Sequence, residues 1–201
     1  KIDFTLDSGM HARVVTYALQ PFTLIGATTR AGLLTGALRS RFGIVHNIRF
    51  YDCDELSAIL QQASAKLALQ TPSEEAFTRI ASRSRGTPRI ALRLLRRVRD
   101  YAQIKHNGDI NISVVNAALE LEGIDEAGLD TLDRAYLATL SGVYEGGPVG
   151  VEAIAASLGE DAGTLQDVVE PYLLQAGMLA RTRQGRKITS SGLQHLNLKS
   201  K

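Results

Sequence analysis

The chain has 201 residues, of which 44% are hydrophobic and 22% are charged, and its formal net charge is +2. This length and apolar content suffice for one large domain or two small ones with ordinary cores. The small net charge excludes a chain that is basic throughout, so any nucleic-acid contact must be local. Cys53 is the only cysteine, which excludes an internal disulfide framework and a cysteine-rich zinc site, and we expect no metal ligands. A reducing, cytoplasmic location is therefore expected.

No apolar stretch reaches the length of a membrane span, and the first residues do not read as a signal peptide. We therefore expect no membrane partner. The sequence begins at Lys1 and enters a strand-like pattern at once, without a lead-in. This start is typical of a segment from inside a longer protein.

Residues 1–50 have the pattern of an α/β sheet domain. Apolar residues alternate with polar ones on either side of a turn signal within residues 1–19, which predicts a β-hairpin. Residues 22–27 are apolar on both faces, which predicts a strand buried in a parallel sheet. These strands are too few to complete a sheet.

Residues 51–119 have the helical period and predict a small all-α domain. The segment around Ser73 carries a cap followed by two acidic residues, which is typical of a helix start. Another helix is predicted to open at Thr87-Pro88-Arg89, with one apolar side and one arginine-rich side. Apart from Arg89, we interpret these arginines as a solvated face.

Residues 120–133 are acidic and contain two glycines, which favours a linker or an exposed helix start. Residues 134–201 then form a separate domain. Helical segments are predicted at about 133–143, 151–158 and 164–176, followed by a short hairpin around 183–186. Three helices and a hairpin in this order predict a winged helix.

Positive charge is concentrated in the last 21 residues, which contain no acidic residue. Cations at a hairpin tip can reach the phosphates of a DNA duplex. The alternative is a hairpin whose charges serve only solubility. If the wing binds DNA, its candidate contacts are Arg181, Arg183, Arg186 and Lys187.

Polar and cationic residues follow the predicted buried strand. Thr29 lies at the carboxyl end of that strand, where α/β proteins bind ligands. Arg39 and Arg41 follow a short helical stretch. A guanidinium at a domain edge can neutralise charge on a phosphoryl group that is being transferred in a neighbouring subunit, although surface ion pairing is the simpler interpretation.

Several motifs, taken together, resemble one family. These are residues 21–32, 38–45 and 85–91, supported by 94–100, Gly146-Gly147-Pro148-Val149-Gly150 and Glu170-Pro171-Tyr172-Leu173. In this order they closely resemble the RuvB family, Holliday-junction branch-migration motors of the AAA+ class. The resemblance implies a multidomain fold: the remnant of an AAA+ α/β sheet domain, an all-α lid and a winged-helix DNA-binding domain.

The resemblance also implies roles for individual residues. Thr29 would be the sensor of the γ-phosphate, and Arg41 the arginine finger that acts in the adjacent subunit. Arg89 would be the second sensor, and Tyr51 would pack against the nucleotide. Arg181 and Arg186 would touch DNA. The implied partners are duplex DNA in Holliday junction arms, RuvA docked by the hairpin of residues 1–19, and further copies in a hexameric ring, with ATP and Mg²⁺ as cofactors of the full-length protein.

One expected element is absent from these 201 residues. They contain no Gly-x-x-x-x-Gly-Lys-Thr loop and no apolar run that ends in Asp-Glu, the elements that hold the phosphates and Mg²⁺. We therefore expect the family activity to be an ATP-dependent DNA helicase, but this chain alone to be inactive. The alternative is a non-enzymatic winged-helix DNA-binding regulator, which would explain the basic wing but not Thr29, Arg41 and Arg89 together.

Overall fold

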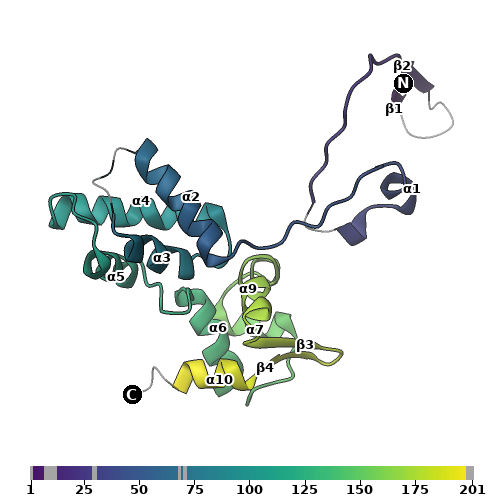
Figure 1. Ribbon diagram of the computed structural model, residues 1–201. Helices are drawn as coiled ribbons and strands as arrows, with labels where there is room; N and C mark the ends of the chain where they lie inside the picture. Colours follow the sequence, from purple (N-terminus) through teal and green to yellow (C-terminus); the bar gives the residue numbers. More distant parts are fainter. Residues whose placement is uncertain (1, 7–12, 29–30, 68, 70–71, 198–201) are drawn as a thin grey trace. The chain divides into compact units, whose positions relative to one another are not determined.

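The computed structural model describes residues 2–6, 13–28, 31–67, 69 and 72–197 (Figure 1). The chain divides into two units, Lys1–Ile48 and Arg49–Lys201. Each unit is described separately below. Within the described residues, none of the helices combines the length and apolar character needed to cross a bilayer.

The first unit contains the predicted hairpin. Strands β1 (Ile2–Leu6) and β2 (Arg13–Tyr17) pair antiparallel, with Ile2 opposite Tyr17 and Leu6 opposite Arg13. The directly opposed Asp3 and Thr16 are joined by a 2.6 Å hydrogen bond from the threonine hydroxyl, as polar cross-strand neighbours often are. The hairpin prediction is confirmed for these strands, while its tip at residues 7–12 lies outside the described residues.

The predicted buried strand at residues 22–27 is wrong. This segment is irregular, and the side chains of Phe22 and Ile25 are 65% and 87% exposed. A strand needs a hydrogen-bonded neighbour, and among the described residues of this unit only β1 and β2 pair. The apolar pattern indicates a preference for burial, whereas residues 22–27 are exposed in this unit.

Two short helical elements follow in the first unit. The 3₁₀ turn η1 (Ala31–Leu33) precedes helix α1 (Gly36–Arg39), and Thr35 caps α1 by accepting from the backbone N–H of Leu38 at 3.3 Å. The ring of Phe42 lies over Gly26, because a Cβ placed at Gly26 would be 3.6 Å from the ring. Segment 22–27 is thereby held against the turn that leaves α1.

The second unit begins with the predicted helical lid, formed by α2 (Cys53–Lys66), α3 (Glu74–Ser82), α4 (Pro88–Lys105) and α5 (Ile112–Leu121). Asp52 and Glu55 form a reciprocal capping box at the start of α2, which satisfies two backbone donors. Ser73 caps α3 as predicted. The four helices share one core, whose fully buried members include Leu60, Ile80, Leu95, Val98, Val115 and Leu119.

The winged helix follows with a core of its own. Its helices are α6 (Thr131–Gly142), α7 (Val151–Leu158) and a third helical region made of α8 (Ala162–Thr164), the π-helical segment η2 (Leu165–Val169) and α9 (Glu170–Gln175). The wing is the antiparallel pair β3 (Leu179–Thr182) and β4 (Gly185–Ile188). Fully buried residues of this core include Tyr136, Leu140, Ile154, Leu165 and Leu173.

Two features of the winged helix were not predicted. A last helix, α10 (Ser190–Asn197), follows the wing and packs against α6. Val149 forms an isolated antiparallel bridge to Arg186, with backbone N–O distances of 3.0 and 2.7 Å. This bridge ties the loop before α7 to strand β4, so the wing has backbone hydrogen bonds on both sides of β4.

Candidate functional site

Arg41 lies in the turn that follows α1, and its side chain is exposed to solvent. The backbone N–H of Arg41 donates to the carbonyl of Leu38 at 3.1 Å, which continues the capped helical turn by one step. The side chain is exposed, and no partner for its guanidinium is recorded among the described residues. A guanidinium on such a turn, with no partner among the described residues of its unit, can act on an external anion. Thr29, the predicted sensor, lies outside the described residues.

Tyr51 and Arg89 are brought to the same end of the lid. The backbone N–H of Tyr51 donates to the carbonyl of Gly86 at 2.9 Å, so the residues that precede α2 lie against the loop that precedes α4. Gly86 has φ of +64°, and a Cβ there would approach Cβ of Phe50 to 2.8 Å. Only glycine permits this close approach of the two segments.

The N-terminus of α4 has the electrostatic character of an anion-binding helix end. Thr87 makes no side-chain cap hydrogen bond, although its carbonyl accepts from the N–H groups of Ile90 and Ala91 at 3.1 and 3.0 Å. Pro88 has no N–H, so Arg89 carries the first-turn N–H for which no acceptor is recorded among the described residues. Arg89 is exposed in the same turn. The helix dipole and the guanidinium both favour an anion at this position.

The wing arginines are organised by one buried carboxylate. Glu170, the first residue of α9, has a side chain that is 0% exposed. Arg181 Nε donates to Glu170 Oε2 at 2.7 Å, and Arg186 Nε donates to Oε1 at 2.9 Å. Tyr136 of α6 also donates to Oε1, at 3.0 Å. Burial and the nearby Glu170 charge both raise the pKa of the Tyr136 hydroxyl, which stays a donor at neutral pH.

The predicted DNA contacts therefore fall into two groups. Arg181 and Arg186 share the charge of Glu170, but the Arg181 side chain is still 47% exposed and that of Arg186 18%. Arg183 and Lys187 are exposed, and no ion pair is recorded for either among the described residues. One carboxylate against four cations leaves the wing positive, with two charges held in place and two free to follow a phosphate backbone.

Glu170 belongs to one of the family motifs, but the sequence did not indicate its role. The available signal was an ionisable residue between Val169 and Leu173, both of which are buried. A carboxylate in such a position requires cationic or hydrogen-bonding partners, because an unpaired buried charge is very unfavourable. The basic hairpin next along the chain was the available source of those partners.

Three family models match the sequence, and between them they cover most of the chain. They are the Holliday junction DNA helicase RuvB P-loop domain over residues 1–48, the RuvB AAA lid domain over 51–125 and the RuvB C-terminal winged helix domain over 126–197. The first match contains Arg41, the second contains Tyr51 and Arg89, and the third contains the basic wing.

Individual relatives agree with these matches. The Holliday junction branch migration complex subunit RuvB of Desulfosudis oleivorans is 51% identical over 197 residues, which are 98% of this chain and 57% of that protein. The solved structure described as the Thermotoga maritima RuvB Holliday junction branch migration motor is 50% identical, with a TM-score of 0.83 over 89% of this chain and 60% of that one. Substitution variants of the Thermotoga maritima protein match with the same TM-score. The chain thus spans somewhat more than half the length of these relatives, and it belongs to the RuvB family, with part of the AAA P-loop domain, the helical lid and the winged helix.

Proposed function

We propose that this chain is the part of a hexameric motor that completes its neighbour's ATP site and grips duplex DNA during Holliday junction branch migration. The observation that carries the proposal is Arg41, whose exposed guanidinium has no recorded partner among the described residues of its unit. An arginine finger must be free to enter the neighbour's site, where it stabilises charge on the transferring phosphoryl group. The names of the relatives, a branch migration complex subunit and a branch migration motor, support the same reading.

Nucleotide recognition would be divided between this chain and other residues of the motor. Arg89, at the uncapped start of α4, and Tyr51 fit one face of a bound nucleotide, and Thr29 would sense the γ-phosphate. The 201 residues contain no glycine-rich loop with Lys and Thr. They therefore do not fit the phosphates and Mg²⁺ by themselves, and we propose that this chain alone does not hydrolyse ATP.

The wing is proposed to hold the duplex through its phosphates. Arg181 and Arg186 would present a fixed pair of guanidinium groups, while Arg183 and Lys187 would adjust to the backbone. Contacts of this kind give affinity without sequence preference, as a translocating motor requires. The hairpin of β1 and β2 is proposed to dock RuvA, and the cytoplasm is the proposed location.

The direct test uses the protein in which this chain follows its phosphate-binding loop. We expect ATP-dependent migration of a synthetic Holliday junction in the presence of RuvA, and no ATP turnover above background from the 201 residues alone. Turnover by the purified 201-residue chain would refute the proposed division of the site. A full motor that binds junctions and hydrolyses ATP but moves no DNA would refute the proposed function.

A further inference from the structure

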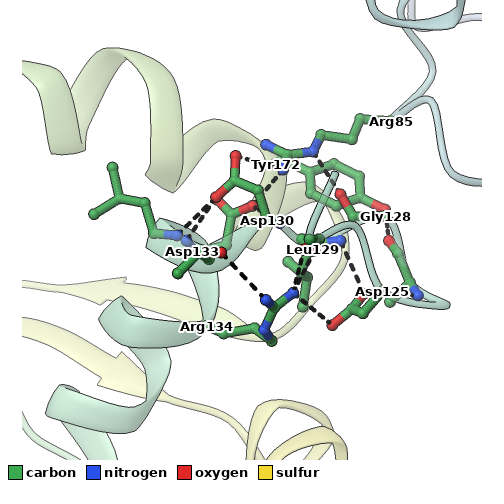
Figure 2. Close-up of polar contacts among 12 residues, drawn as sticks. Arg85, Asp125, Gly128, Leu129, Asp130, Asp133, Arg134 and Tyr172 are labelled. Atoms are coloured by element: carbon green, nitrogen blue, oxygen red, sulfur yellow. Dashed lines mark hydrogen bonds and ion pairs between the residues drawn. The ribbon is translucent and has the colours of Figure 1, made fainter. Parts of the chain in front are cut away.

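Arg85 belongs to the lid, yet its side chain contacts the winged helix and the segment that leads to it (Figure 2). It lies in the loop between α3 and α4, and its side chain is 9% exposed. Nε donates to the carbonyl of Gly128 at 2.8 Å, and Nη2 donates to Asp130 Oδ2 at 3.0 Å and to Asp133 Oδ2. The guanidinium also lies over the ring of Tyr172 in α9, 5.2 Å from its centre.

The two carboxylates that receive Arg85 are fixed at the start of α6. Asp130 is the N-cap, which accepts from the backbone N–H groups of Leu132 and Asp133 at 2.9 and 3.0 Å. Asp133 Oδ2 accepts from the N–H of Asp130 at 2.9 Å and is buried. The other oxygen of Asp133 has no hydrogen-bond partner among the described residues. Without Arg85, Asp133 would be a buried and largely uncompensated charge.

The segment between the lid and α6, predicted to be a linker or an exposed helix start, is bound on several sides. Asp125 is buried, and its Oδ1 accepts from the N–H groups of Ala127 and Leu129, each at 2.9 Å. Arg134 donates to the carbonyls of Gly123 and Leu129, both at 2.8 Å. Glu120, Glu122 and Glu126 of this segment are exposed, as their charge predicted, whereas Asp125 and Asp133 are buried among backbone N–H donors and arginines.

Two further contacts close the junction. Tyr172 donates its hydroxyl hydrogen to the carbonyl of Ala127 at 2.6 Å, which joins α9 to the connecting segment. A Cβ at Gly128 would lie 2.8 Å from the carbonyl oxygen of Arg83, so the connecting segment runs directly against the backbone of the lid. Lid and winged helix are therefore joined by backbone contact as well as by Arg85.

The loop that carries Arg85 also carries the proposed nucleotide contacts. Arg85 stands four residues before Arg89 and next to Gly86, which accepts the hydrogen bond from Tyr51. Arg85 has φ of +53°, in the left-handed region that a long side chain rarely adopts. This turn therefore connects directly, without a further helix or strand, the proposed nucleotide contact at Arg89 with the side chain that contacts the winged helix.

We propose that Arg85 is a positioning residue that clamps the winged helix to the lid, so that lid movement at Arg89 is transmitted to the DNA-gripping wing. The transmission of movement to DNA rests on the proposed function, whereas the fixed orientation of the two domains does not depend on it. Buried ion pairs often contribute no more to stability than apolar packing would, and in some proteins they select one arrangement. A charged clamp therefore specifies one orientation at the junction where an apolar contact would allow several.

The orientation is tested on the 201-residue chain by distances between paired spin labels. Labels at Arg96→Cys in α4 and Glu152→Cys in α7, both exposed, report the two domains in a Cys53→Ser background. In the otherwise unsubstituted protein we expect one narrow distribution of distances between the labels. Arg85→Asn should at least double its width, because asparagine tolerates positive φ but cannot reach the carboxylates. Arg93→Asn, on the exposed face of α4, is the matched control and should change nothing. An unchanged distribution in folded Arg85→Asn protein would overturn the clamp.

A second variant keeps the test decisive if Arg85→Asn does not fold. Asp133→Asn keeps the size of the side chain and an oxygen for the Asp130 N–H, but removes the charge that faces Arg85. It should also widen the distribution, and a narrow one would contradict the proposal.

The coupling is tested in the full motor by comparing DNA movement with ATP turnover. Arg85→Asn should keep turnover within about twofold while migration per ATP falls at least tenfold, because the chemistry is intact but its movement is not transmitted. Equal losses of turnover and migration would refute a coupling role. If the unsubstituted motor moves no DNA, the proposed function fails, while the spin-label distances still decide the clamp.

Discussion

Arg186, one strand pair from the turn of the wing, donates from Nε to the fully buried Oε1 of Glu170 at 2.9 Å. The same arginine forms the backbone bridge to Val149, so both its main chain and its side chain are fixed. A cation proposed to bind DNA is thus also part of the folded core. Substitution of Arg186 should affect stability as well as binding, and tests of DNA contact are cleaner at other wing positions.

Glu170→Gln should destabilise the winged helix and strengthen the salt dependence of DNA binding. The substitution removes the buried carboxylate from the half-exposed Arg181 and from Arg186, and the loss of these charge-assisted hydrogen bonds should cost about 2 kcal/mol. It also adds one positive charge to the wing, so the log–log slope of affinity against salt should steepen by about one. Urea unfolding and fluorescence anisotropy measure the two effects. Glu152→Gln, at an exposed position of α7, is the control, and unaltered stability of Glu170→Gln would contradict the buried pairing.

Arg183 and Lys187 are the sharper test of phosphate contact. Both are exposed and no ion pair is recorded for either among the described residues, so replacing both with glutamine should leave stability within about 0.5 kcal/mol. If each neutralises one phosphate, the slope of log affinity against log salt should fall in magnitude by about two. Titrations of a mixed-sequence duplex at several salt concentrations measure this. A slope identical to that of the unsubstituted chain would remove Arg183 and Lys187 from the interface.

Arg41→Ala in the full motor should preserve ATP binding and lower turnover by roughly 10³-fold, the contribution of an arginine finger. Arg39→Ala is the matched control, two residues earlier in an exposed position, and should retain turnover. Mixing Arg41→Ala subunits with subunits that lack the loop lysine should restore some activity, because the defects lie on opposite sides of the subunit border. Mixed rings that form but show no recovery at any ratio would place Arg41 within its own subunit.

Asp133 should make the stability of the contact between the lid and the winged helix depend on pH. Burial raises its pKa from 3.8 to about 6, although Arg85 opposes the rise. The folded state then holds the proton more tightly than the unfolded state, so this contribution to stability is complete below pH 4 and is lost as the pH rises through about 6. A shift of about two units corresponds to about 3 kcal/mol. Between pH 4 and pH 7 the unfolding free energy of the unsubstituted protein should fall relative to that of the Asp133→Asn variant. Parallel curves for the two proteins would exclude the effect.

Local signals predicted most of the helices, because caps and periodicity act over a few residues. Ser73 begins α3 and Pro88 begins α4, as their positions in the sequence indicate. Residues 22–27 were assigned wrongly because an apolar run shows a preference for burial without showing what covers it. The opposite error occurred at Asp125 and Asp133, whose charge suggested exposure. Both are buried, because Asp133 pairs with Arg85, 48 residues away, and Asp125 contacts His195, 70 residues away.

The sequence predicted some residues of the candidate site but not others. Family motifs named Arg41, Arg89 and the wing, and the structure places Arg89 beside the Tyr51 segment through the Gly86 hydrogen bond. The roles of Glu170 and Arg85 needed three-dimensional information. The two arginines that bind Glu170 lie 11 and 16 residues away, and the hydrogen-bond acceptors of Arg85 lie 43 to 48 residues away. No local pattern carries such pairings.

The close backbone contacts at Gly86 and Gly128 constrain how this sequence can change over generations. A methyl group at Gly128 would strike the carbonyl of Arg83 at 2.8 Å, and one at Gly86 would strike Phe50 at the same distance, while both residues have positive φ. Every non-glycine mutation at either position meets strain and collision together. The exposed arginines of α4 face no such limit, so drift among descendants should concentrate there and leave the two glycines fixed.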